Sequence, residues 1–368
     1  MNTNKALTAS VLALAFATAA AAQDGAFVAE PGLLRDRPLE EMSEWSKPAA
    51  GDGRGAGDWV DNYANDAGDA FFFAPGVSIN YLDLAEPRSV IRGFTTGNRT
   101  QRATVNVFRD GAPLTDIHGD TNLAEIDLLA VSQVQIYRGA GGDLSYVGDN
   151  LGGAVNFISP TGRTARAPMT GRFDAAVTKD GKPGGQAHAE FAAASGALDY
   201  YASVTGRYED GLRDHNQRID ALFYGNIGYE VSPSFRTRFF VDASRSDDEY
   251  AGGLNEAQLD DDASQAMPAI TLGPLFPGGP IIEFAGGAAE SDIGRRLTTG
   301  RIANVTNFDL FGVEFEGGGH YLRRDVFAPQ IDYAGIRDEN GAEWGVNLSA
   351  RRNLRIWIFD PDLRVGGT

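Results

Sequence analysis

The sequence predicts a β-rich protein in which a small N-terminal α+β domain precedes a long series of antiparallel, membrane-spanning strands. Apolar and polar residues alternate over roughly two hundred residues after Pro160, which is typical of strands in a membrane β-barrel. Glycine is abundant, at 46 of 368 residues, and this favours many turns. The chain contains no cysteine, which argues against a secreted fold stabilised by disulfides.

The first 22 residues have the three parts of a signal peptide. Lys5 lies next to the amino terminus, an apolar run follows over 6–19, and Ala20 to Ala22 provide small residues for cleavage before Gln23. The run is shorter than the ~20 apolar residues of a membrane helix, which is the weaker alternative. Residues 23–57 are polar and interrupted by proline and glycine, so we expect a flexible arm.

Composition and motifs exclude several classes of function. A formal charge of −18 disfavours nucleic-acid binding, which needs a clustered basic face. The four histidines have no metal-binding spacing, and no serine lies in a Gly-x-Ser-x-Gly turn. We therefore expect neither an enzyme nor a cofactor.

Residues 58–130 predict short helices and strands with glycine-containing turns. The apolar spacing over 58–73 predicts an amphipathic helix that ends at Pro75-Gly76, and a second helix is expected over 123–129. Strands are expected at 77–81, at 89–94 around Arg92-Gly93, and at 105–109. Asp110-Gly111 after the last of these is a favourable hairpin turn.

The stretch 131–160 predicts two strands joined by a glycine-rich connection. A dinucleotide-binding turn is not supported, because the sixth position of the motif is Leu144 and no helix follows. A phosphate-binding loop is not supported either, because Gly153 is followed by Ala154-Val155 instead of Lys and Ser or Thr. The glycines therefore indicate a compact β element.

Together these motifs resemble the plug domain of TonB-dependent outer-membrane receptors. Ala140 departs from the family, which usually has proline there, and Val147 separates Tyr146 from Gly148. The matching residues are Pro75, Gly76, Arg92, Gly93, Asp110, Gly111, Arg138, Gly139, Gly148, Gly152, Gly153 and Asn156. The resemblance implies a plug domain over 58–160 and a partial outer-membrane β-barrel over 168–368.

The barrel part predicts paired strands with short turns at one end and one long loop. Ser232-Pro233-Ser234 is a short turn, whereas 247–296 has the length of an extracellular loop. Later strands are expected at 302–315, 344–350 and 354–359. A secreted β-sandwich is the alternative, but aromatic residues at strand ends favour a membrane barrel. About nine strands can be counted where plugged transporters have about 22, so we expect an incomplete barrel, from a fragment or a truncated gene product, that does not import alone.

The resemblance implies a function and several partners. Such receptors lie in the outer membrane and import a scarce ligand, most often a ferric siderophore or another iron chelate, driven by TonB. Arg99, Arg102 and His118 fall in the expected ligand-facing loops, although single charges there are more often solvated. Residues 26–29 are the best candidate for the TonB segment, although four apolar residues here more often belong to a plain tether. We expect Arg92, Arg109 and Arg138 to pair with carboxylates of the barrel interior. A passive porin-like channel and a secreted β-rich binding module remain alternatives.

Overall fold

The fold is described from a computed structural model. The description covers residues 51–55, 67–71, 77–81, 87–91, 94–95, 105–114, 121, 123–138, 152–178, 180–232, 234–268, 270–272, 282–284, 287–289, 292–329, 336–353 and 362–367. Within them, no helix has the length and apolar character needed to cross a lipid bilayer.

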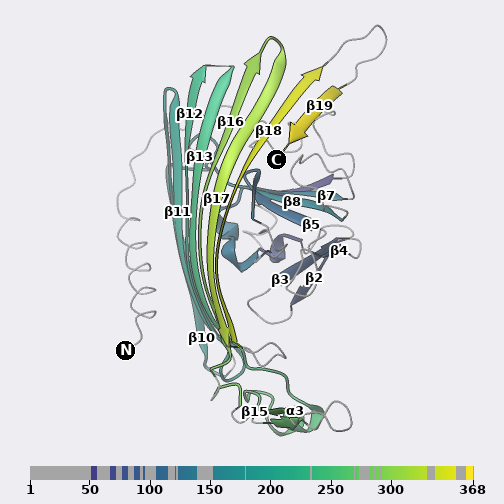
Figure 1. Ribbon diagram of the computed structural model, residues 1–368. Coiled ribbons are helices and arrows are strands. Elements are labelled where there is room, and N and C mark those ends of the chain that lie inside the picture. The colour runs from purple at the N-terminus through teal and green to yellow at the C-terminus, as the bar shows by residue number, and fades with distance from the viewer. Residues whose placement is uncertain are drawn as a thin grey trace.

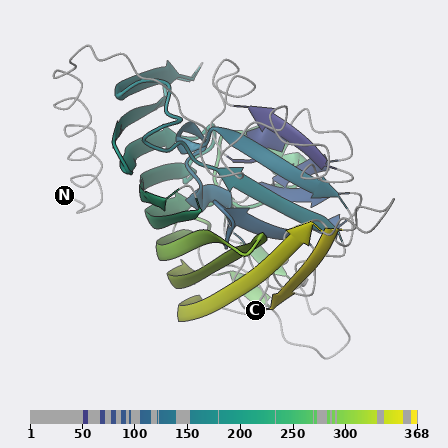
Figure 2. The ribbon, with the colours of Figure 1, turned by 90° about the horizontal axis from the view of Figure 1, so that it is seen from above.

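A nine-stranded antiparallel sheet, called the wall below, forms the larger part of the molecule (Figure 1). Its strand order is β19-β18-β17-β16-β13-β12-β11-β10-β9, so β9 and β19 are the edges of the sheet that the structure describes. Seen from above, the strands form an open arc (Figure 2). The strands are β9 (Met169–Val177), β10 (Pro183–Ser195), β11 (Leu198–Asp210), β12 (Gln217–Ser232), β13 (Phe235–Glu249), β16 (Gly294–Leu310), β17 (Val313–Pro329), β18 (Ile336–Asn353) and β19 (Asp362–Gly367).

The two faces of the wall differ because successive side chains of a strand point to opposite sides. On β13, Arg238 and Phe240 are buried on the concave face, at 5% and 4% exposure. Their neighbours Phe239 and Val241 are 54% and 41% exposed on the other face. The wall thus has an apolar outer face and charged residues inside, as the alternation in the sequence predicts.

The N-terminal part, called the plug below, lies in the hollow of the arc (Figure 2). Its larger sheet has the order β1-β7-β8-β5-β6, in which β5 and β8 are parallel and the other pairs are antiparallel. A second sheet has the order β2-β3-β4. The strands are β1 (Gly51–Gly55), β2 (Val77–Tyr81), β3 (Pro87–Ile91), β4 (Phe94–Thr95), β5 (Val105–Arg109), β6 (Ala112–Pro113), β7 (Gln133–Arg138) and β8 (Gly153–Ile158).

An apolar core holds the plug together. Fully buried side chains from β5, β7 and β8 pack with Phe71 and with the segment after β6. Phe71 and Phe157 meet edge to face, with their ring centroids 6.0 Å apart. The plug therefore has a core of its own.

The helices predicted for the plug differ from the structure. The described part of the first, 67–71, contains only the 3-10 turn η3 (Asp69–Phe71). The prediction over 123–129 is wrong, because this stretch forms two 3-10 turns, η4 (Leu123–Glu125) and η5 (Leu128–Ala130). Asp127 separates them, since its carboxylate accepts a hydrogen bond from the Leu129 amide and begins a new turn.

Two predictions in the wall also need correction. The single strand expected at 302–315 is two strands, because Phe311 and Gly312 adopt positive φ and form a turn between β16 and β17. The long loop expected at 247–296 runs between Glu249 and Gly294, and its described parts include α3 (Glu256–Asp261), β14 (Ile270–Leu272) and β15 (Ile282–Phe284). The strand expected at 354–359 lies outside the described residues. The short turn between β12 and β13 is confirmed.

Candidate functional site

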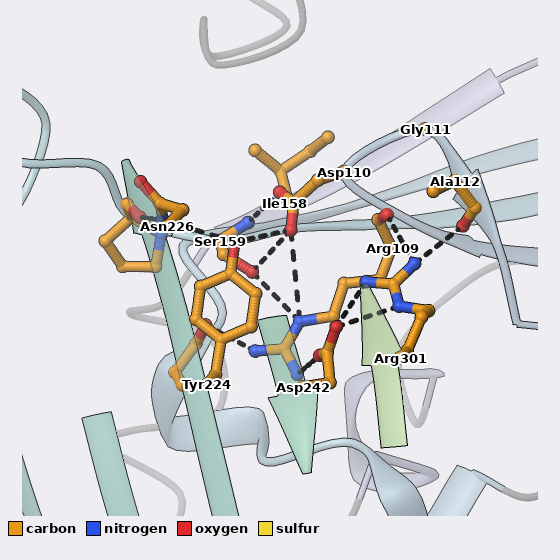
Figure 3. A network of polar contacts seen from close by, with 12 residues as sticks. Arg109, Asp110, Gly111, Ala112, Ile158, Ser159, Tyr224, Asn226, Asp242 and Arg301 are labelled. Carbon is orange, nitrogen blue, oxygen red and sulfur yellow. Dashed lines mark hydrogen bonds and ion pairs between the residues drawn. The ribbon is translucent and has the colours of Figure 1, made fainter. Parts of the chain in front are cut away.

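The contact surface between the plug and the wall, called the seam below, is rich in buried charged side chains (Figure 3). At its centre Asp242 of β13 lies between two arginines. Its Oδ1 is 2.8 Å from Nη1 of Arg109, on plug strand β5, and its Oδ2 is 2.8 Å from Nε of Arg301, on wall strand β16. One carboxylate therefore joins the plug to two wall strands.

The turn after β5 places a second plug carboxylate in the seam. Asp110 and Gly111 have φ of 52° and 76°, as in the tight hairpin turns that favour Asp-Gly. The Asp110 carboxylate accepts hydrogen bonds from the Ser159 amide at 2.8 Å and from the Tyr224 hydroxyl of β12, also at 2.8 Å. The hairpin thus binds both the end of β8 and the wall.

Arg109 remains charged although it is buried. Burial alone would lower the pKa of Arg109, but Asp242, Tyr224 and Asp110 outweigh it, so that the pKa is raised. Its guanidinium donates to Ser159 Oγ and lies 3.8 Å from the centroid of the Tyr224 ring. Arg301 donates to the carbonyls of Arg109 and Ala112, at 3.2 and 3.1 Å. The expectation that Arg109 pairs with a carboxylate of the barrel interior is confirmed.

The 3-10 turns supply two further carboxylates. Glu125 accepts from Nε of Arg324, on β17, at 2.9 Å. Asp127 accepts a short hydrogen bond from the Thr205 hydroxyl of β11 and lies 3.4 Å from Nδ1 of His188. Burial would raise the pKa of Asp127, but the hydrogen bond with His188 and other polar contacts lower it to about 2. Both turns are therefore held to the wall by charge.

The connection from β8 to the wall is also fixed by polar contacts. Asn226 donates to the Pro160 carbonyl at 2.8 Å. The carboxylate of Asp199 accepts from the Gly162 amide at 3.2 Å and from Arg238 at 2.8 Å. Gly162 lies so close to β10 and β11 that an added Cβ would meet the Ala193 carbonyl oxygen at 2.1 Å. Only glycine fits this approach without a backbone shift.

The seam offers little room for an organic ligand. The hollow between Arg109, Glu125, Asp242 and Arg301 has a cavity volume of only about 10 Å³, far below the roughly 300–1,000 Å³ of ligand pockets. Within the described residues, no group of three or more His, Asp or Glu side chains is arranged to hold a metal ion. The geometry therefore fits retention of the plug.

The structure describes some of the predicted motif residues. Asn156 Oδ1 accepts a hydrogen bond from the Gly111 amide at 3.1 Å. Gly152 precedes β8 and Gly153 is its first residue. Arg138 of β7 is the backbone partner of Gly153 in the sheet. The candidate ligand residues Arg99, Arg102 and His118 lie outside the described residues, and so do Pro75, Gly76, Arg92, Gly93, Gly139 and Gly148.

The sequence prediction missed the wall side of the seam. Asp242, Arg301 and Tyr224 are far from the plug motifs along the chain. Their only signal is a polar residue at an inward position of an alternating strand. Alternation indicates which face of the wall a side chain lies on, but it does not indicate which plug residue that side chain contacts.

Comparisons with known proteins agree with this architecture. Residues 56–154 match the family model described as TonB-dependent Receptor Plug Domain. No curated protein sequence matches the chain.

Solved siderophore receptors share the fold at low sequence identity. The receptor PirA from Acinetobacter baumannii has a TM-score of 0.61 and 13% identity, over 87% of this chain and 47% of PirA. The ferric yersiniabactin uptake receptor FyuA from Yersinia pestis has a TM-score of 0.62 and 13% identity, over 86% of this chain and 47% of FyuA. P. aeruginosa FpvA, solved with heterologous pyoverdines, has a TM-score of 0.58 and 14% identity, over 88% of this chain and 42% of FpvA. The chain spans about half the length of these structures.

The fold and the seam define a class of protein in which a small globular plug is held by charge inside a curved β-sheet wall. Within this class, residues 56–154 belong to the TonB-dependent receptor plug domain family, and the chain has the fold of the plug and of part of the barrel of the siderophore receptors above.

Proposed function

We propose that the protein acts in the outer membrane as a TonB-dependent importer of an anionic iron chelate such as a ferric siderophore. The observation that carries this proposal is the seam, where Asp242 binds Arg109 and Arg301. Buried polar bonds hold the plug in the hollow of the wall, so the plug blocks passage until work is done to displace it. This supports an energised importer over a passive porin, which needs no such closure.

The outer face of the wall supports the membrane location. Large apolar side chains are exposed there, whereas charged ones are buried inside. Such a surface suits contact with lipid, because a barrel strand places its apolar side chains outward. The partner of this face is outer-membrane lipid, reached after export and removal of residues 1–22.

The proposed mechanism begins with binding from outside and ends with displacement of the plug. A pull by TonB on the arm over 23–57 loads the plug and separates part of it from the wall. The ligand class rests on Arg99 and Arg102, whose planar guanidinium groups suit the carboxylates of an anionic chelate, and on the siderophore receptors that share the fold. His118 is a third candidate contact.

Two binding measurements with the purified chain test the proposal. The first titrates the chain, in detergent, with the isolated C-terminal domain of TonB. The second titrates it with iron-loaded and iron-free chelators of several chemical types, following tryptophan fluorescence. We expect binding of TonB and a preference for an iron-loaded anionic chelate. An Arg99→Ala, Arg102→Ala double variant should lose the chelate and keep TonB.

The alternatives predict different results. A passive porin binds neither TonB nor a chelate, and a secreted binding module does not bind TonB. Loss of TonB binding on deletion of 23–57, with chelate binding retained, would separate the energy-coupling role from the ligand role. Chelate binding that is equal in the double variant and in the unaltered chain would reject the proposed site.

A further inference from the structure

His188 lies at the seam between two carboxylates, one from each side. It is on β10 and only 6% exposed. Its Nδ1 is 3.4 Å from Asp127 of the plug, and its Nε2 is 3.9 Å from Glu190 of the wall. Neither the plug motifs nor the proposed ligand site uses this histidine.

The hydrogen bonds determine where the protons are. The Thr205 hydroxyl has one proton and donates it to the Asp127 carboxylate, which can only accept. Thr205 Oγ1 is also 2.7 Å from His188 Nδ1, so this nitrogen must donate to the hydroxyl oxygen. On the other side Nε2 faces a carboxylate, which favours a proton there too.

Glu190 is itself held as an acceptor. Tyr201 donates its hydroxyl to Glu190 Oε2 at 2.6 Å, and Thr170 of β9 donates to Oε1 in a short hydrogen bond. The hydrogen bonds that both carboxylates accept favour their ionised form, and a positive charge between them lowers the cost of burying them. Arg207 of β11 adds an attraction to Asp127, and Arg172 is opposite His188 on β9 and pairs with Asp174.

We propose that His188 is a proton-dependent clasp between plug and wall: as an imidazolium it bridges Asp127 and Glu190, and loss of its proton frees the plug turn Leu128–Ala130. Asp127 makes this coupling direct. Its second oxygen accepts from the Leu129 amide and caps that turn. A neutral imidazole would present a lone pair to one carboxylate, so the bridge is lost as the pH rises.

Proton placement can be tested in the unaltered chain. We expect the nitrogen NMR shifts of histidine-labelled protein in detergent at pH 7.5 to identify one imidazolium, and its resonance to be missing in His188→Gln. If His188→Gln does not fold, the other three histidines are replaced one at a time, as His118→Gln, His215→Gln and His320→Gln. An imidazolium resonance that persists in all three variants belongs to His188. A neutral imidazole at His188 would overturn the proposal.

Hydrogen exchange tests the clasp itself. After correction for intrinsic exchange, protection of the Leu129 and Ala130 amides should fall at least tenfold between pH 7 and pH 10. In His188→Gln protection should be low already at pH 7 and change little with pH, although Tyr201 and Glu190 remain. His320→Gln, which alters another wall histidine, should behave as the unaltered chain. An equal pH response in His188→Gln would reject the clasp, and neither result depends on TonB or on a chelate.

Discussion

The plug core and the seam are both buried, but they are built from opposite chemistry. In the core, Phe71, Phe157 and Val155 are fully buried among other apolar side chains. In the seam, Arg109 and Arg301 are buried against carboxylates and carbonyl oxygens. Water can replace part of the polar bonds of the seam when it opens, whereas nothing compensates for exposing an apolar core to water. We therefore expect separation of the plug from the wall to cost less than unfolding of the plug core.

The largest effect is expected from a cavity in the plug core. Phe157→Ala removes a ring that packs edge to face on Phe71, and should destabilise the plug by about 4 kcal/mol. Hydrogen exchange of the β5 and β8 amides measures this. Phe311→Ala is the matched control, because Phe311 is 89% exposed, and should change stability by less than about 0.5 kcal/mol. Equal effects would contradict the assignment of the core.

A smaller effect is expected when the centre of the seam is broken. Asp242→Ala leaves Arg109 and Arg301 without their shared carboxylate and should cost about 3 kcal/mol. The chain has no cysteine, so an Ala112→Cys probe at the buried seam reports opening by its rate of alkylation. We expect a roughly 100-fold faster rate, with the β5 and β8 amides still protected.

A control distinguishes this loss from a general charge effect. Asp325→Ala removes a carboxylate from the exposed pair with Arg323, which should contribute less than about 1 kcal/mol. The alkylation rate should then stay within about fivefold of the unaltered rate. A large increase with Asp325→Ala would mean that the probe does not report on the seam.

Acid should open the seam before it unfolds the core. Asp127 has a pKa of about 2 in the fold, below the 3.8 of an unperturbed carboxyl. The lowered pKa contributes stability that is complete above about pH 5 and is lost as the pH falls towards 2, at most about 2 kcal/mol. The alkylation rate should rise over this range. Asp127→Asn should remove part of the rise, and an identical pH profile would contradict the role of Asp127.

The smallest effect concerns one hydroxyl. Tyr224→Phe removes the donor to Asp110 but keeps the ring beside Arg109, and Ser159 still donates to this carboxylate. The expected cost is about 1 kcal/mol, or roughly fivefold in the alkylation rate. Thermal unfolding of the plug core should be unchanged. A loss as large as that of Asp242→Ala would mean that the Tyr224 hydroxyl, and not the ion pair of Asp242 alone, holds the seam.

Much of the plug sheet could be predicted from local sequence. The strands β5, β7 and β8 and the Asp110-Gly111 turn follow from alternation and from turn chemistry, which act over a few residues. The stretch 123–129 has helical spacing, yet Asp127 divides it, because its side chain caps a second short turn. Tertiary contacts to Thr205 and His188 then fix that division.

The alternating strands of the wall could be predicted from the sequence, but the turns between them were less predictable. An apolar Phe311 at a turn conflicts with the rule that turns are polar, and the break between β16 and β17 is therefore hidden. The seam was predictable on one side only. Arg109 was expected to meet a carboxylate, but its partner Asp242 is 133 positions away, and only the register of five successive strands brings it there.

The position of β1 at the edge of the plug sheet has a mechanical consequence. Under tension from the N-terminal side, β1 is the first strand to carry the load. Among the described strands it pairs with β7 alone, so one row of backbone hydrogen bonds resists the force, whereas β8 lies between β7 and β5 and is held by two rows. Three of its five residues are glycines, which regain the most conformational freedom on release. The order of strands in the sheet thus sets an order of rupture, in which β1 separates before the hairpin that carries Arg109 and Asp110.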